Sequence, residues 1–191
     1  MSHIDKRGIR TEALRRRRAQ IDRDRTSALI LTRLTALPEF CDANQVAWYI
    51  DVRDEVRTRP HLHRRLAAGE SVIVPFCRGD DLRLCRINHT EELAIGAFGI
   101  QEPLAALQDD TTRQVDPATL DLVVVPGVAF DRSGRRLGHG FGFYDRLLAR
   151  VAEATKLTAI AFECQMFDIL PHEPHDVTVD VVVTESNVYR R

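Results

Sequence analysis

The segment from Asp121 to Arg150, DLVVVPGVAFDRSGRRLGHGFGFYDRLLAR, carries most of the information on how this chain folds. Its first part, residues 121–126, is a predicted strand that is apolar at every position after Asp121, which is typical of a strand buried on both faces of a sheet. A polar turn and three alternating glycines separate this strand from a predicted helix over 142–154. A buried strand followed by a helix is the repeating unit of parallel α/β sheets.

The rest of the chain alternates helices and short apolar strands in the same way. The predicted helices cover residues 5–20, 24–36 and 60–68; the predicted strands cover 46–50, 71–75, 82–87, 158–162 and 177–183, and 88–119 is irregular. This order predicts an α/β fold with a mostly parallel twisted sheet and helices on both faces, a Rossmann-like three-layer arrangement forming a single domain over residues 1–191. Ligands of such sheets bind beyond the carboxyl ends of the strands.

Composition excludes several classes of protein. The 191 residues are 44% hydrophobic and 29% charged, which excludes wholesale disorder, and the scattered 10 Gly and 8 Pro exclude collagen-like repeats. No apolar run approaches the roughly 20 residues of a membrane span, so no membrane partner is expected. The first 18 residues are polar and basic, unlike a secretory signal. The expected location is the cytoplasm, where the four cysteines would be thiols.

The formal net charge of −1 conceals an asymmetry along the chain. Residues 1–25 carry nine basic and four acidic side chains, a net charge of +5, so the remainder carries −6. A basic arm on an acidic body fits three roles: binding nucleic acid, binding an anionic ligand, or solubility. The four consecutive arginines at 15–18 point around most of a helix, so they do not form a single stripe and are expected to be mostly solvated.

The alternating glycines of the opening segment suggest a site for phosphate. Gly138, Gly140 and Gly142 let backbone N–H groups turn toward an anion, and the following helix start adds positive potential. Arg136 supplies charge beside them, and Asp145 could hold Mg²⁺ that shares its shell with phosphate oxygens. The loop is neither a Walker A motif nor a G-x-G-x-x-G fingerprint. A tight turn with Asp145 only favouring the helix start is the simpler alternative.

The run PGVAFDRSGRRLGHGFGFYDR, residues 126–146, resembles the signature of the 5-formyltetrahydrofolate cyclo-ligase family, also called methenyltetrahydrofolate synthetases. That signature is approximately P-G-x-x-F-D-x-x-G-x-R-L-G-x-G-x-G-[YF]-Y-D, which is long and specific. KRGIR at 6–10, DEVRT at 54–58, GIQEP at 99–103 and the segment 161–184 are similar to further parts of the family pattern. The resemblance therefore extends along most of the chain.

The resemblance implies an enzyme that converts 5-formyltetrahydrofolate, with or without a polyglutamate tail, to 5,10-methenyltetrahydrofolate. ATP and Mg²⁺ are the implied cofactors, and ADP and phosphate the other products. In the family's usual scheme the formyl oxygen attacks the γ-phosphate, and the resulting iminophosphate is displaced by the neighbouring folate nitrogen. The implied protein acts as a monomer and binds no nucleic acid.

The resemblance also implies roles for individual residues. The nucleotide-binding residues would be Lys6, Arg7, Gly8, Ile9, Arg10, Arg136, Leu137, Gly138, His139, Gly140, Phe141, Gly142, Phe143 and Tyr144. Arg136, Tyr144 and Asp145 would be catalytic, Asp145 and Asp180 would hold the metal, and Ile50, Glu55 and Phe98 would contact folate.

Two alternatives remain open. Phe141 and Phe76 stand where relatives often carry other residues, which leaves room for a non-catalytic module that binds nucleotide or folate. The arginines at 15–18 leave room for a basic-arm RNA-binding protein, although no aromatic platform accompanies them.

Overall fold

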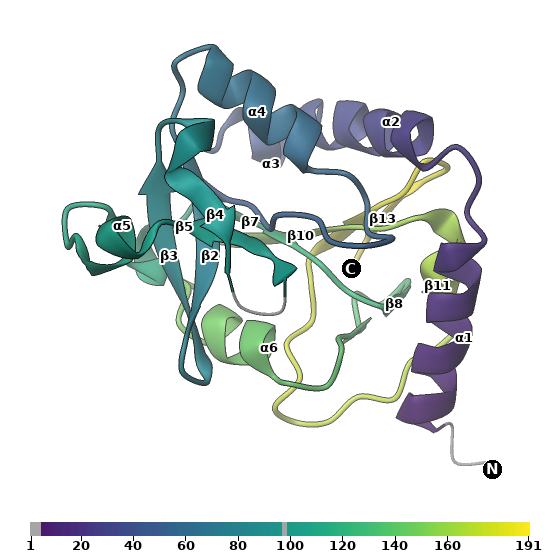
Figure 1. Cartoon of the computed structure of the whole chain (residues 1–191). Coiled ribbons are helices and arrows are strands. Elements are labelled where there is room, and N and C mark those ends of the chain that lie inside the picture. The colour runs from purple at the N-terminus through teal and green to yellow at the C-terminus, as the bar shows by residue number, and fades with distance from the viewer. Residues whose placement is uncertain (1–4, 97–98) are drawn as a thin grey trace.

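The computed structural model describes residues 5–96 and 99–191, and in these residues an eight-stranded sheet lies between helices (Figure 1). The helices are α1 (Lys6–Arg18), α2 (Arg23–Thr35), α3 (Pro38–Cys41), α4 (Arg59–Ala67), α5 (Ala105–Asp109) and α6 (Phe143–Leu148). The strands of this sheet are β1 (Val46–Ala47), β2 (Val72–Arg78), β3 (Asp81–Ile87), β6 (Gln114–Val115), β7 (Leu122–Val125), β10 (Lys156–Ile160), β12 (Val181–Val183) and β13 (Val188–Arg190). The smaller sheets contain β4 (Leu93–Ile95) with β5 (Gln101–Pro103), and β8 (Ala129–Asp131) with β9 (Arg136–Leu137) and β11 (Met166–Phe167).

The strand order of the large sheet is β13-β12-β10-β7-β1-β2-β3-β6. The central strands from β12 to β2 are parallel, whereas β13, β3 and β6 join antiparallel at the two sides. The predicted α/β class with a mostly parallel sheet is therefore confirmed. The antiparallel β13, in contrast, was not predicted from the sequence.

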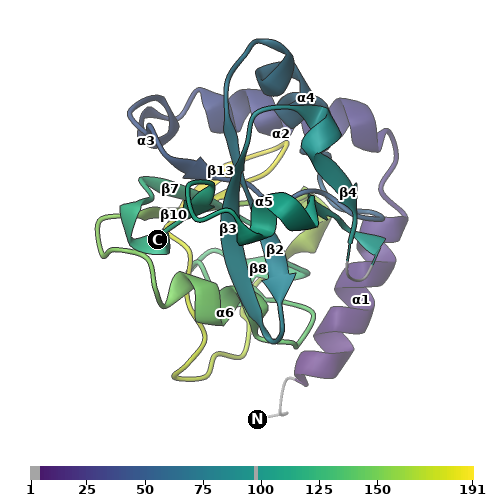
Figure 2. The same ribbon diagram turned by 60° about the vertical axis from the view of Figure 1, so that its left-hand side comes forward.

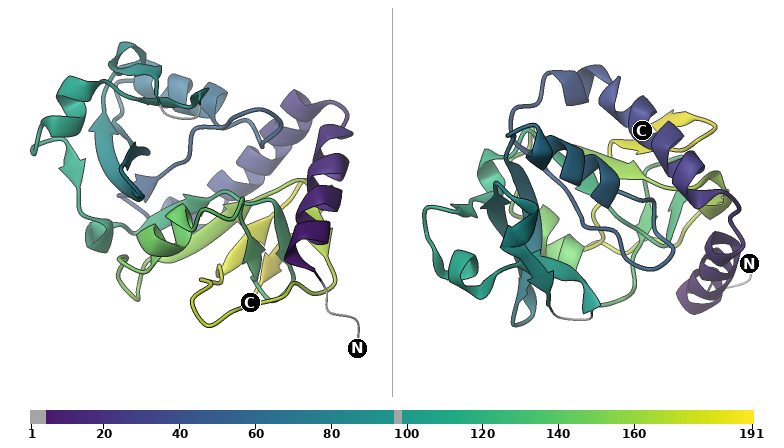
Figure 3. Two further views of the ribbon diagram at one scale, coloured as in Figure 1. Left: turned by 60° about the horizontal axis from the view of Figure 1, so that its bottom comes forward. Right: turned by 45° about the horizontal axis from the view of Figure 1, so that its top comes forward.

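The sheet separates two hydrophobic layers, and β7 shows how its residues alternate between them. Leu122 and Val124 pack in one cluster with Ile30 of α2 and other side chains of α2 and α4. Val123 and neighbouring side chains pack in the other with Leu147 of α6. Figures 2 and 3 show α2 and α4 on one side of the sheet and α6 on the other. Burial on both faces explains why this strand is apolar at every position.

Helix α1 packs away from the large sheet, against the small sheet of β8 and β9 (Figure 1). Its Ile9 and Ala13 form a third cluster with Val128, Leu137 and Leu170. The carboxylate of the preceding aspartate accepts hydrogen bonds from the first backbone N–H groups of the helix, at 2.9 and 3.2 Å. The basic helix is thus fixed beside the chain that connects β7 to α6.

The predicted strand over 46–50 is too long, because pairing stops after a few residues. The Trp48 N–H still bonds to the Ile73 carbonyl, at 2.8 Å. Thr58 then takes over: its hydroxyl donates to the Tyr49 carbonyl and accepts from the Asp51 N–H, at 2.8 and 3.1 Å. A side chain replaces the sheet partner here, so residues 49–58 close into a loop that the strand pattern does not reveal.

Three further segments differ from the prediction. The helix over 142–154 ends at Leu148, because the chain returns to the sheet: the Lys156 N–H bonds to the Asp121 carbonyl at 2.8 Å to begin β10. The strand predicted over 177–183 covers only β12. The segment 88–119 is not wholly irregular, since it contains β4, β5, α5 and β6. These elements are two to five residues long, which is too short for periodicity to predict. No described helix is long and apolar enough to cross a bilayer.

Candidate active site

The glycine loop over residues 138–142 joins β9 to α6 and is held from two directions. Arg10 of α1 donates from Nε to the Gly138 carbonyl at 2.8 Å, and Arg146 donates from Nη1 to the Phe141 carbonyl at 3.1 Å. Gly140 has φ +101°, a conformation that residues with a side chain rarely adopt. Because α6 has only six residues, the positive potential at this loop comes mainly from arginine side chains rather than from the helix end.

Arg136 is a buried cation beside this loop. Its Nη2 lies 2.6 Å from Asp145 Oδ1, and its guanidinium carbon lies 5.9 Å from the centre of the Tyr144 ring. Its Nε is buried and has no hydrogen-bond partner among the described residues. A buried donor without a partner is costly, and an anion at this position would satisfy it.

The two acids predicted to hold the metal have separate partners. Asp145 Oδ1 accepts from Arg136 and, at 3.4 Å, from the Val177 N–H. Asp180 lies at the start of β12 and accepts from the Leu157 N–H at 2.9 Å and from Arg191 at 3.3 Å. No group of three or more metal-ligating side chains occurs in the described part of the chain. A single half-buried carboxylate suits Mg²⁺ that arrives with phosphate oxygens, rather than a resident ion.

Helix α1 directs its first basic residue toward a neighbouring loop. Lys6 Nζ lies 2.8 Å from Glu173 and 2.9 Å from Asp176, so two carboxylates occupy it. Arg7 and Gly8 are exposed, and Ile9 is buried in the third cluster. Of the predicted nucleotide residues on this helix, Arg10 therefore contacts the glycine loop and Lys6 contacts the 173–176 loop.

Replacing Lys6 by methionine is expected to raise the KM for MgATP about tenfold, because the family resemblance assigns this cation to the phosphates of ATP. Replacing Glu173 by glutamine should lower that KM, because phosphate would then compete with one carboxylate fewer for Lys6. Steady-state kinetics with varied MgATP would measure both effects, with Arg15→Met as the control on the exposed side of the same helix. An unchanged KM in both variants would limit Lys6 to anchoring α1.

The loop after β1 places a carboxylate inside the molecule. Glu55 is buried, and its Oε2 accepts from the Val52 N–H at 3.1 Å. Burial raises the pKa of this carboxyl to about 7, while the positive charge of Arg17 opposes that rise. Ile50 is also buried, in the cluster beneath this loop. The two predicted folate residues in this segment are thus both buried parts of the loop over residues 49–58.

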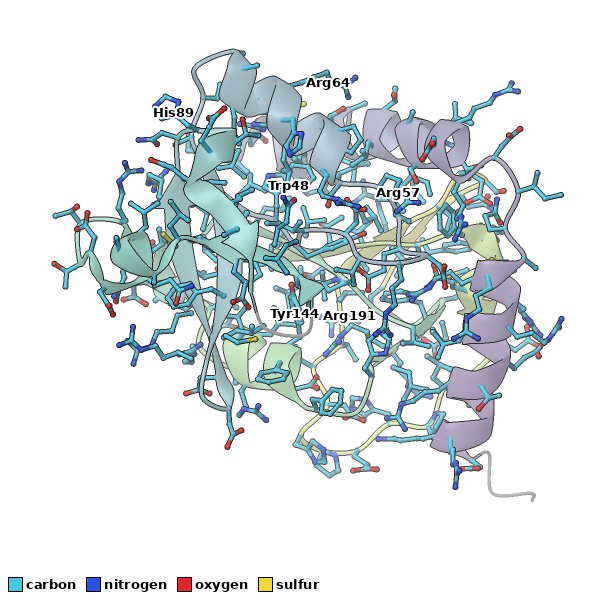
Figure 4. All side chains as sticks on the ribbon, viewed as in Figure 1. Trp48, Arg57, Arg64, His89, Tyr144 and Arg191 are labelled. Carbon is cyan, nitrogen blue, oxygen red and sulfur yellow. The ribbon has the colours of Figure 1, made fainter. Side chains whose placement is uncertain are left out.

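Tyr144 is close enough to Arg136 and to this carboxylate for both charges to act on its hydroxyl. It is half-buried in the first turn of α6, on the side facing the sheet (Figure 4). Burial raises the pKa of its hydroxyl, Glu55 raises it further, and Arg136 opposes this. The pKa of the Tyr144 hydroxyl is therefore affected by one charge near the predicted phosphate site, Arg136, and by one near the predicted folate site, Glu55.

A further acid that was not predicted as a site residue approaches the same area from β5. Glu102 is buried and accepts from the Cys77 N–H at 3.1 Å. Burial raises the pKa of the Cys77 thiol to about 11, with the Glu102 charge as the next cause. The thiol is therefore neutral at neutral pH. The matching GIQEP segment at 99–103 was the available signal for this acid.

The aromatic side chains predicted for the site differ in their exposure and contacts. Phe141 is 67% exposed at the tip of the glycine loop, and its ring centre lies 6.2 Å from that of Phe143. His139 is exposed at the surface; partial desolvation lowers its pKa, and Arg17 lowers it further. Phe98 lies outside the described residues, so its predicted contact with folate stays a prediction.

The arginines at 15–18 are expected from the sequence to be mostly solvated, and Arg17 is the exception. Arg17 is buried, whereas Arg15 and Arg16 pair with Glu12 at the surface. The pattern contained a signal for this: Arg17 follows buried Ala13 at a spacing of four residues and so continues the inner face of the helix.

The fold and this cluster define an α/β protein with a cationic glycine loop next to a buried carboxylate. The chain belongs to the 5-formyltetrahydrofolate cyclo-ligase family, whose model matches residues 2–185. The cyclo-ligase of Mus musculus is 28% identical over 95% of this chain and 94% of its own length, and that of Escherichia coli K12 is 33% identical over 83% and 87%. The NMR structure of Aquifex aeolicus 5,10-methenyltetrahydrofolate synthetase is similar with a TM-score of 0.83 and 37% identity, covering 97% of this chain and 92% of that one. The predicted family is thereby confirmed.

Proposed function

We propose that this protein converts 5-formyltetrahydrofolate to 5,10-methenyltetrahydrofolate, using ATP with Mg²⁺ and releasing ADP and phosphate. The observation that carries this proposal is the buried Arg136, which lies 2.6 Å from Asp145 beside the glycine loop and whose buried Nε has no hydrogen-bond partner among the described residues. A site that combines this cation with the buried carboxylate of Glu55 suits a reaction between a nucleotide and a second substrate. The family membership supports the same reaction.

The chemical problem is that an amide oxygen is a poor leaving group. The formyl oxygen forms a bond to the γ-phosphorus while the bond to the ADP oxygen breaks. The folate nitrogen N10 then forms a bond to the formyl carbon, loses its proton, and phosphate departs with the former formyl oxygen. Both steps need reactants held in line and negative charge neutralised, rather than a nucleophile from the protein.

The side chains of this chain divide these tasks. Arg10 and Arg136 would bind phosphate oxygens beside the glycine loop, and Lys6 would join them when released from its two acids. Asp145 would hold Mg²⁺, which neutralises charge on the transferring phosphate. Asp180 remains a candidate for the same ion through its carboxylate at the start of β12.

The folate side would be recognised chiefly by Glu55. The pterin ring presents N–H and amino donors along one edge, and a buried carboxylate accepts such donors well. Ile50 would contribute apolar contact from below. Phe141, at the exposed tip of the glycine loop, would pack on a bound substrate from the solvent side.

A turnover assay tests the proposal directly. Purified protein with 5-formyltetrahydrofolate and MgATP is expected to form the methenyl product, followed by its absorbance, with one ADP released per product. Omitting ATP or chelating Mg²⁺ should stop the reaction. Binding of ATP and folate without product would instead favour a non-catalytic module, and binding of neither would contradict the proposal.

A further inference from the structure

Arg17 differs from its neighbours in the run of four arginines. Its side chain is 3% exposed, against 69% for Arg15, 39% for Arg16 and 71% for Arg18. Burial of a guanidinium is costly unless its partners compensate for the lost hydration. The contacts of Arg17 should therefore show what its burial serves.

The backbone contact of Arg17 does not account for this burial. Its Nη1 lies 3.4 Å from the Gly127 carbonyl, a long hydrogen bond. That carbonyl already accepts from Gln165 Nε2 at 3.0 Å, so it does not depend on the arginine. The Arg17 Nε, in addition, is buried without a partner among the described residues.

The other partner of Arg17 is Glu55, whose Oε1 lies 3.9 Å from Nη1. The two oxygens of this carboxylate are used differently. Oε2 accepts from the Val52 N–H, whereas Oε1 accepts no hydrogen bond from the described residues and faces the guanidinium. The arginine thus lies beside a carboxylate oxygen that is available to a ligand.

We infer that Arg17 is a positioning residue for folate recognition: from α1 it faces Glu55 Oε1, favours the ionised form of this carboxylate and leaves that oxygen available to the N–H donors of the substrate ring. This inference rests on the function proposed above. It gives a role to the one buried arginine of the run.

The other charged and titratable groups around Glu55 do not replace Arg17. Asp51 and Arg53 come from the same loop and act in opposite directions on its pKa. Tyr49 and Tyr144 are phenols whose own pKa values are raised by Glu55, so they are neutral at working pH. Arg17 has the largest effect of these charges, and its loss would favour the protonated, neutral form of the carboxyl.

The test is the pH dependence of kcat/KM for 5-formyltetrahydrofolate in Arg17→Met. The acid limb is expected to move upward by about one pH unit, which is about tenfold in kcat/KM below that limb, because Glu55 would ionise later. The KM for MgATP should stay within about twofold of wild type. Arg17→Lys, which keeps the charge, should return the limb toward wild type, and the exposed Arg18→Met should leave it unchanged.

A Glu55→Gln background separates this role from a general structural one. In that variant the acid limb of Glu55 should disappear. Adding Arg17→Met should then shift only a limb that belongs to His139, whose pKa Arg17 also lowers. If Arg17→Met does not fold, Arg17→Gln and Arg17→Lys compared across the same pH range replace it. If Arg17→Met or Arg17→Gln keeps the acid limb of the wild type, the inference about Arg17 is wrong, while the proposed function stands. Absence of turnover in wild type overturns the proposed function as well.

Discussion

Asp145→Asn is expected to lower kcat about a thousandfold, because asparagine keeps the shape of the side chain but removes its charge. The loss has two sources in this site. The carboxylate is the proposed protein ligand of Mg²⁺, and it is also the partner of Arg136 at 2.6 Å. Without it, the buried guanidinium is left without its ion pair and is free to shift from the phosphate position.

The measurement is kcat at saturating folate and ATP over a range of Mg²⁺ concentrations, together with thermal unfolding. Asp81→Asn is a matched control, because Asp81 forms a 3.5 Å ion pair with Arg146 of the same helix while half-exposed. It should change kcat by less than about twofold. If Asp145→Asn retains more than a tenth of the wild-type kcat at saturating Mg²⁺, the assigned metal role is wrong.

Gly134→Ala is expected to destabilise the protein by about 3 kcal/mol or more, which corresponds to roughly 10 °C in Tm for a chain of this size. Gly134 occupies the turn between β8 and β9 with φ +76°. A Cβ added there would lie 2.1 Å from the Val179 carbonyl oxygen. That oxygen belongs to the backbone, and the adjacent Val179 N–H bonds to the Gly134 carbonyl at 2.8 Å, so neither chain can easily move away.

Gly69→Ala separates the cost of the backbone conformation from that of the collision. Gly69 has φ +81°, and a Cβ there would meet nothing within 4 Å. It should therefore cost only about 1 kcal/mol, from the left-handed conformation alone. Reversible unfolding in urea would give both values, and equal costs for the two substitutions would show that the turn of Gly134 relaxes.

The sequence allowed a good prediction of the elements that depend on local patterns. The helices at the amino-terminal end agree with the structure to within two residues at each boundary, because apolar spacing and capping residues lie within the segment itself. Strand β7 is apolar at every position, as expected for a strand that packs into a hydrophobic cluster on each face of the sheet. The short elements between 88 and 119 were missed, since two to five residues give no measurable period.

The candidate site was predictable only in part. The glycine loop, Arg136 and Asp145 follow one another in a single stretch, so their proximity follows from the sequence alone. Their proximity to Glu55 and Arg17 does not follow from the sequence, because those two residues lie some 80 to 130 positions earlier in the chain. The roles of Asp180 and Phe98 stay predictions.

By itself the sequence determined the α/β class, the glycine loop and the basic character of the first helix, because these depend on residue types and short spacings. Only the tertiary structure decided how the charge of that helix is used. It buries Arg17 beside Glu55 and pairs Lys6 with two acids of a distant loop. The physical reason is that burial and ionisation depend on what packs against a side chain, and those neighbours come from segments far apart in sequence.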